Sequence, residues 1–128
     1  MNLLLDTQVV VWMLSASGSI PRPVRETIAD GANALFVSAV STWEIAIKSA
    51  LGKIDVDLPK LVTALGRVGA AKLPVTIEHT LRVRDLPPHH RDPFDRLLIA
   101  QAQIEHLLIL TADPWFDRYD VTTIRPVP

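Results

Sequence analysis

The sequence has no cysteine among its 128 residues, which excludes a disulfide framework and any metal site built from thiolates. The absence of cysteine also favours a reducing compartment, so we expect a cytoplasmic protein. No apolar run approaches the roughly 20 residues that a membrane span needs, because the apolar N-terminus is interrupted at Asp6. That N-terminus lacks a basic leader, so we interpret it as part of a hydrophobic core and expect no membrane association.

A strong charge of either sign is lacking as well, since 13 basic residues face 14 acidic ones and the net charge is −1. This balance does not by itself indicate a nucleic-acid-binding protein. The chain also contains no internal repeat, no low-complexity tract and no linker long enough to divide it. Its hydrophobic fraction of 48% is typical of a globular protein, and we expect residues 1–128 to form a single domain.

Short apolar runs alternate with helical patterns along the chain. The runs do not alternate apolar with polar residues, which favours strands that are buried on both faces of a parallel sheet. They cover residues 3–5, 34–37 and 107–110 and, more weakly, 72–75 and 121–124. The helical patterns cover residues 41–52, 58–69 and 92–106. Residues 9–14 are rich in β-branched side chains, yet the alternation of elements favours a helix there, and the fold class is α/β.

Two aspartates follow predicted strands, Asp6 after residues 3–5 and Asp113 after residues 107–110. In open α/β sheets, ligands bind beyond the carboxyl ends of the strands, so these two carboxylates are expected at one edge. Glu44 and Asp95 fall in the first turns of predicted helices, and a first turn directed at that edge brings two more carboxylates. We therefore predict that the four acids converge on one cleft.

Four carboxylates that lie close together repel one another unless a cation balances their charge. Ligands that are all oxygen atoms, with no cysteine, select a hard ion such as Mg²⁺ or Mn²⁺ over zinc. Such a site is suited to phosphodiester hydrolysis, in which bound metal activates the attacking water and stabilises the leaving oxygen. No nucleophile from the protein is required.

Structural roles compete with this interpretation at three of the acids, and Asp113, which precedes Pro114, is also a candidate turn residue. Ser41 and Glu44 have the spacing of a capping box, so Glu44 is also a candidate for closing its own helix terminus. Asp92 and Pro93 have the pattern of an N-cap followed by the first helical residue, which leaves Asp95 where negative charge favours the helix dipole. For Glu44 and Asp95, capping and catalysis therefore both remain open.

Other polar and aromatic residues give weaker signals. The adjacent His89 and His90 follow Pro87 and Pro88, and we interpret them as solvated loop residues rather than metal ligands. The tryptophans share no helical spacing and are interpreted as core or interface residues; they are Trp12, Trp43 and Trp115. Three basic residues near the acids are candidates for holding substrate phosphates, although Lys48 is equally a helix-surface partner of Glu44; they are Lys48, Arg91 and Arg96.

Four segments occur in a fixed order along nearly the whole chain: LLLDT, STWEIAIK, HRDPFDRLLIAQA and LLILTAD. Together they resemble the PIN-domain ribonucleases, and especially the VapC toxins of bacterial toxin–antitoxin pairs. The resemblance implies a three-layer α/β/α domain with a central, mainly parallel sheet. It also implies an endoribonuclease that depends on Mg²⁺ or Mn²⁺.

The family's acidic residues fall on Asp6, Glu44, Asp95 and Asp113 of this sequence, and the resemblance implies that these residues are catalytic and hold the metal. Asp6 and Asp95 are expected to carry most of the metal coordination. Other roles are expected around them. Thr7 is expected to orient a ligand and Arg96 to orient the substrate. Asp92 is expected mainly to cap its helix and secondarily to lie in the outer shell of the metal site. Asp117 competes with Asp113 for the fourth position.

The resemblance further implies an RNA substrate, a cognate VapB-like antitoxin and a homodimer. Trp12 and neighbouring apolar residues are our prediction for part of the antitoxin surface. A catalytically silent PIN-like binding module that acts through its protein partner is the alternative. An aspartyl-phosphate phosphatase is discounted, because that class requires a second aspartate two residues after the first, and position 8 is Gln8.

Overall fold

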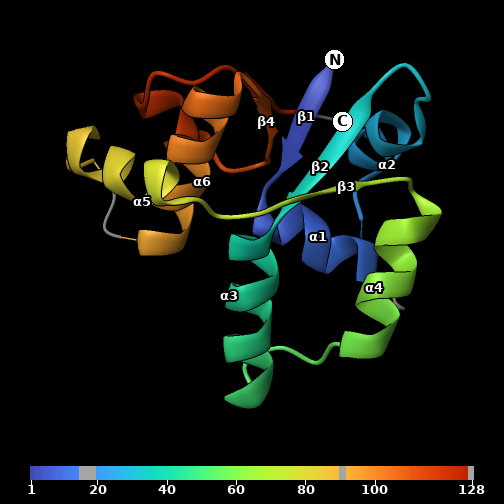
Figure 1. The fold of residues 1–128 in the computed structure, drawn as a ribbon. Helices are drawn as coiled ribbons and strands as arrows, with labels where there is room; N and C mark the ends of the chain where they lie inside the picture. The colour runs from blue at the N-terminus through green and yellow to red at the C-terminus, as the bar shows by residue number, and fades with distance from the viewer. Residues whose placement is uncertain (15–19, 90–91, 127–128) are drawn as a thin grey trace.

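A parallel sheet forms the centre of the protein in a computed structural model, which describes residues 1–14, 20–89 and 92–126 (Figure 1). The described residues form five strands in the order β3-β2-β1-β4-β5, and every neighbouring pair is parallel. The strands are β1 (Asn2–Leu5), β2 (Ala34–Ser38), β3 (Ala71–Leu73), β4 (Leu108–Leu110) and β5 (Thr123–Ile124).

Helices cover both faces of this sheet (Figure 1). They are α1 (Thr7–Leu14), α2 (Arg22–Ala29), α3 (Ala39–Ala50), α4 (Leu58–Arg67), α5 (Ile77–Arg82) and α6 (Pro93–Glu105), with two short 3-10 helices, η1 (Val83–Asp85) and η2 (Pro114–Arg118). In β1, Leu3 and Leu5 belong to a core cluster with residues of α1, α2, α3 and α4, whereas Leu4 belongs to a second cluster with residues of α3, α6 and η2. The two cores on opposite faces confirm the predicted three-layer α/β/α fold.

The strongest predicted strands are confirmed, and their burial explains why the sequence has apolar runs at these positions. Leu3, Leu4 and Leu5 are all fully buried, as a non-alternating apolar run predicts for a strand covered on both faces. The helix expected at residues 9–14 is also confirmed, since α1 covers Thr7–Leu14 and is separated from β1 by Asp6 alone. The two weaker strand candidates form only the short edge strands β3 and β5.

The start of α3 differs from the prediction. The helix begins at Ala39, and the Ser38 hydroxyl caps it by accepting a hydrogen bond from the Val40 amide at 3.0 Å. Ser41 is therefore inside the helix, and the predicted capping box with Glu44 does not form. Glu44 lies in the second turn of α3, so capping does not account for its presence.

The chain order creates a crevice where the site was expected. From β1 the chain continues to β2 on one side, while β4 pairs with β1 on the other side. Such a reversal of strand order leaves an open space at the carboxyl ends of the two central strands, because the following connections diverge. Asp6 directly follows β1, and Asp113 lies three residues beyond β4.

Within the ranges described above, no helix combines the length and the apolar character that a membrane crossing requires.

Candidate functional site

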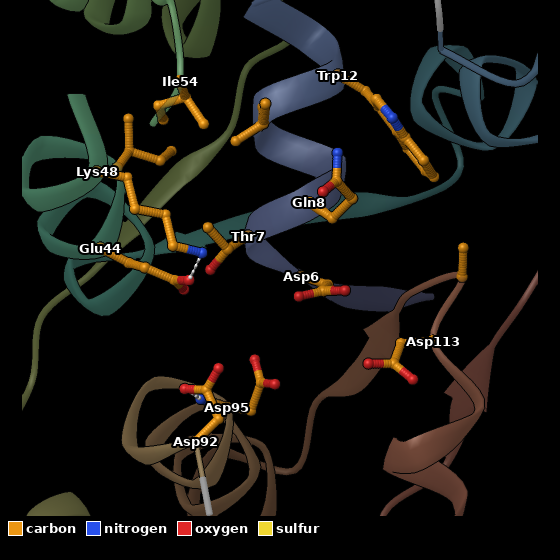
Figure 2. Close-up of a pocket in the computed structure, with 13 residues that line it drawn as sticks. Asp6, Thr7, Gln8, Trp12, Glu44, Lys48, Ile54, Asp92, Asp95 and Asp113 are labelled. Atoms are coloured by element: carbon orange, nitrogen blue, oxygen red, sulfur yellow. Dashed lines mark hydrogen bonds and ion pairs between the residues drawn. The ribbon is translucent and has the colours of Figure 1, made fainter. Parts of the chain in front are cut away.

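A cavity of about 670 Å³ lies at the carboxyl ends of β1 and β4. Five carboxylates line it and surround a common open space (Figure 2). They belong to Asp6, Glu44, Asp92, Asp95 and Asp113. The structure thus brings the four predicted acids to one cavity and adds Asp92 to them.

Asp6 is the most buried of the aspartates in the cavity, with 6% of its surface exposed. The pKa of its carboxyl is raised from 3.8 to about 6, chiefly because burial disfavours the charged form. A hydrogen bond from Thr111 opposes this rise, and the nearby charge of Asp113 adds to it. A cation beside Asp6 would offset the unfavourable free energy of burying its charged carboxylate.

Thr111 connects the two aspartates that follow the central strands. Its hydroxyl donates to Asp6 Oδ2 at 2.8 Å and accepts from the backbone amide of Asp113 at 2.9 Å, and the residue is fully buried. We did not predict this residue from the sequence. The sequence does indicate it in one respect: Thr111 follows a predicted buried strand and precedes Asp113 by two positions.

Glu44 projects from α3 into the cavity, and Lys48 lies one turn further along the same helix (Figure 2). Lys48 Nζ is 2.6 Å from Glu44 Oε2. The second oxygen, Glu44 Oε1, is buried and has no hydrogen-bond partner among the residues that the structure describes. The pKa of Lys48 is raised by its hydrogen bond to Glu44, against the effect of burial, and the charges of Asp92 and Asp95 also raise it.

Asp92 and Asp95 lie at the start of α6, and their roles are different. Asp92 is the N-cap: its Oδ1 accepts from the amides of Phe94 at 2.8 Å and Asp95 at 3.2 Å, with Pro93 at the first helical position. This capping prediction is confirmed. Asp95, in the first turn, points into the cavity (Figure 2), so the cap positions the helix that carries it.

The fourth acid of the cavity is Asp113 rather than Asp117. Asp113 caps η2 by accepting from the Trp115 amide at 2.9 Å, and it also lines the cavity. Asp117 is not among the lining residues. Its carboxylate instead accepts from the Thr123 hydroxyl at 2.5 Å and pairs with Arg125 at 2.7 Å.

Thr7 lines the cavity, but its hydroxyl is bonded to Ser41 Oγ at 2.9 Å, which links α1 to α3. Arg96 does not line the cavity. Its guanidinium donates to three backbone carbonyl groups between α5 and α6, those of Val83, Leu86 and Pro87. The guanidinium of Arg96 is therefore directed at the segment before α6 and not into the cavity.

Of the remaining candidates, Trp12 lies at the cavity, and the others lie elsewhere or outside the described residues. His89 packs its ring against Tyr119, with centroids 5.3 Å apart, whereas His90 and Arg91 lie outside the described residues. Trp43 packs edge-on against Phe94, and Trp115 lies beneath the guanidinium of Arg118.

The site fits a hard divalent cation by its donor set, although the acids are not yet gathered around one point. Among the described residues, no group of three or more acidic or histidine side chains is already arranged to hold a metal ion. The cavity nevertheless offers the carboxylate oxygens of five residues, and Glu44 Oε1 is a buried acceptor that lacks a hydrogen-bond partner among the described residues. A buried oxygen of this kind is normally satisfied, and a cation would satisfy it.

Comparison of the sequence with known families gives a match over residues 3–121, to the model of the PIN domain. The chain belongs to the PIN domain family. No curated protein matches the sequence significantly.

Solved structures with the same fold extend over nearly the whole chain. VapBC2 from Rickettsia felis, bound to a DNA fragment from its promoter, has a TM-score of 0.71 at 15% identity and covers 99% of this chain and 100% of that chain. FitAcB from Neisseria gonorrhoeae has a TM-score of 0.63 at 19% identity, with 97% of both chains covered. DNA-bound VapBC from Salmonella typhimurium has a TM-score of 0.70 at 12% identity, with 98% of both covered. At these identities the likeness shows a shared PIN-domain fold.

Proposed function

We propose that the protein is a metal-dependent endoribonuclease and the toxin of a VapBC-type toxin–antitoxin pair. The observation that carries the proposal is the convergence of Asp6, Glu44, Asp95 and Asp113 on one cavity of a PIN domain. The four acids come from four different elements or their ends, which no single local capping pattern explains.

Asp6 and Asp95 would hold most of a Mg²⁺ or Mn²⁺ ion, with Glu44 and Asp113 beside it. A divalent cation bound there supplies the Lewis acid for phosphodiester hydrolysis. Thr111 orients the Asp6 carboxylate and keeps its charged form accessible near neutral pH, since its hydrogen bond lowers the pKa of Asp6. The Asp92 cap holds the first turn of α6, which places Asp95.

The proposed partners are RNA as the substrate and a VapB-like antitoxin, and the proposed assembly is a homodimer, in the cytoplasm. Support for the antitoxin comes from the fold, because the similar structures include VapBC and FitAcB. Trp12 borders the cavity, so a partner that covers it would also close the acid site. Light scattering of the purified chain measures the oligomer: a mass of twice 14.1 kDa supports the homodimer, and a monomer mass would contradict it.

A catalytically silent binding module is the second candidate, and two observations favour it. Within the described part of the chain, the acids are not already arranged to hold a metal, and Glu44 is bound to Lys48. In that case the carboxylates would only hold helices in place, and substitution of Asp6 would change stability without changing any chemistry.

Incubation of the purified protein with total cellular RNA and Mn²⁺ separates the two candidates. We expect cleavage that EDTA abolishes and that Asp6→Asn and Asp95→Asn each reduce by about 100-fold or more, since each removes a charge that the transition state needs. Asp117→Asn is the matched control, because that aspartate lies outside the cavity, and it should retain activity. Absence of any metal-dependent cleavage would leave the binding module as the better account.

A further inference from the structure

The ion pair between Glu44 and Lys48 is asymmetric. The Glu44 side chain is only 6% exposed, whereas the Lys48 side chain is 45% exposed. A buried carboxylate without a nearby positive charge is strongly unfavourable, whereas a lysine on a flexible four-carbon stem can reach water. Glu44 therefore depends on Lys48 more than Lys48 depends on Glu44.

Lys48 is also the cation of the cavity itself. Among the described residues that line the cavity, it alone is basic, and it faces five carboxylates. Figure 2 shows its side chain extending along α3 with Nζ directed at Glu44. The charges of Asp92 and Asp95 act on the same ammonium group. Among the described residues, Lys48 thus supplies the positive charge of the cavity.

A second helical pair shows what an ordinary surface interaction looks like in this protein. Arg22 and Glu26 are also four residues apart, with Nε 2.8 Å from Oε1, but their side chains are 80% and 63% exposed. Exposed pairs of this kind contribute little, because water screens them. Lys48 differs because its partner is buried and belongs to the acid site.

We propose that Lys48 is the internal counter-cation of this cavity, which neutralises Glu44 in the metal-free protein and is held less firmly by Glu44 once a divalent cation shares that carboxylate. The inference rests on the metal site of the proposed function. Lys48 stabilises the metal-free fold and lowers the affinity for metal, because a divalent cation competes with its ammonium group for the same carboxylates. It is a positioning residue that sets the metal concentration at which the site fills.

Isothermal titration with Mn²⁺ tests the inference on Lys48→Met, which retains the length of the side chain and removes its charge. We expect the dissociation constant for Mn²⁺ to fall by about tenfold or more, since one competing positive charge is removed. The melting temperature of the metal-free variant should fall at the same time. Lys48→Arg, which keeps the charge, should bind Mn²⁺ like the wild type, and Arg22→Met should change neither quantity.

The outcomes separate this inference from the proposed function. Mn²⁺ binding by the wild type with unchanged or weaker binding by Lys48→Met would overturn the role of Lys48 and leave the metal site intact. Absence of Mn²⁺ binding by the wild type would overturn both the metal site and the inference.

A measurement on the wild-type protein does not depend on the folding of any variant. Brief acetylation with acetic anhydride, followed by mass spectrometry, reports how freely each lysine amine reacts. Added Mg²⁺ should increase the labelling of Lys48, because its amine is then held less firmly by Glu44, while Lys60, whose side chain is 80% exposed, serves as the reference. Labelling of Lys48 that is unchanged or reduced relative to Lys60 would overturn the proposal.

Discussion

Asp6 combines two properties that a purely structural aspartate does not need. It is buried at the end of β1, where its charged form is disfavoured, yet it is kept beside a second acid, Asp113. Its raised pKa means that the folded metal-free protein binds the Asp6 proton more tightly than the unfolded chain does. The cost of this arrangement is expected to show in the pH dependence of stability.

Asp6→Asn should remove that cost. The folded pKa of Asp6, about 6, lies above its unfolded value near 3.8, so this group stabilises the fold at low pH, and its contribution is lost as the pH rises from about 4 to about 6. Relative to the wild type, the metal-free variant should gain on the order of 3 kcal/mol in free energy of unfolding between pH 4 and pH 7. Urea denaturation at both pH values with EDTA measures it; a difference that does not change with pH would count against a buried, strained carboxylate.

Thr111→Val should destabilise the protein, because it leaves Asp6 without its hydroxyl donor and the Asp113 amide without an acceptor. We expect a loss of about 1–3 kcal/mol in urea denaturation at pH 7, together with weaker Mn²⁺ binding, since the Asp6 proton is then harder to remove. Thr80→Val, at an exposed helical position where the hydroxyl donates to the Ile77 carbonyl, is the matched control. Equal effects of the two substitutions would contradict the bridging role of Thr111.

At the scale of single elements, the start of α6 shows how capping and a functional residue are combined. Asp92 satisfies two amides of the first turn, and that turn directs Asp95 into the cavity. α1 and α3 are linked to each other at the same end of the sheet by the Thr7–Ser41 hydrogen bond. The hydrogen bonds at the helix termini therefore fix the elements that carry Asp95 and Glu44 at the cavity.

Substitutions at Asp92 and Asp95 should separate the two roles. Asp92→Ala should cost about 1 kcal/mol of stability through loss of the cap, whereas Asp92→Asn, a good capping residue, should remain near the wild type. Asp95→Asn should keep the helix but abolish metal-dependent RNA cleavage. Thermal melts and the cleavage assay give both quantities for each variant. If Asp92→Asn abolished cleavage as fully as Asp95→Asn, the division between cap and ligand would be wrong.

At the scale of the whole molecule, the layered fold was predictable because strands buried on both faces leave apolar runs such as residues 3–5. The convergence of the acids was also predictable, since parallel strands end at one edge. The start of α3 was not predictable from the sequence, because Ser38 and Ser41 are both acceptable N-caps. Ser38 is the cap in the structure because β2 ends there. The Thr111–Asp6 hydrogen bond joins residues that are 105 positions apart, which no local pattern encodes. The partners of Arg96 and Asp117 lie nearer in sequence, but they belong to loops and edge elements whose course has no periodic pattern.

Divalent cations should stabilise the whole domain. At a Mn²⁺ concentration about 100 times the dissociation constant, the gain is roughly 2.7 kcal/mol, which corresponds to a rise in melting temperature on the order of 10 °C for a chain of this length. Asp6→Asn combined with Asp95→Asn should abolish the rise, and excess EDTA should reverse it in the wild type. A melting temperature indifferent to both Mg²⁺ and Mn²⁺ would be evidence against a metal site.

The central claim is that the catalytic cation binds in the carboxylate cavity at the ends of β1 and β4. The most direct test is the anomalous scattering of manganese in crystals of the protein grown or soaked with Mn²⁺. We predict a peak inside the cavity, in contact with Asp6 and Asp95, that is lost in crystals of Asp6→Asn. An empty cavity at saturating Mn²⁺, or a peak confined to another part of the molecule, would contradict the claim.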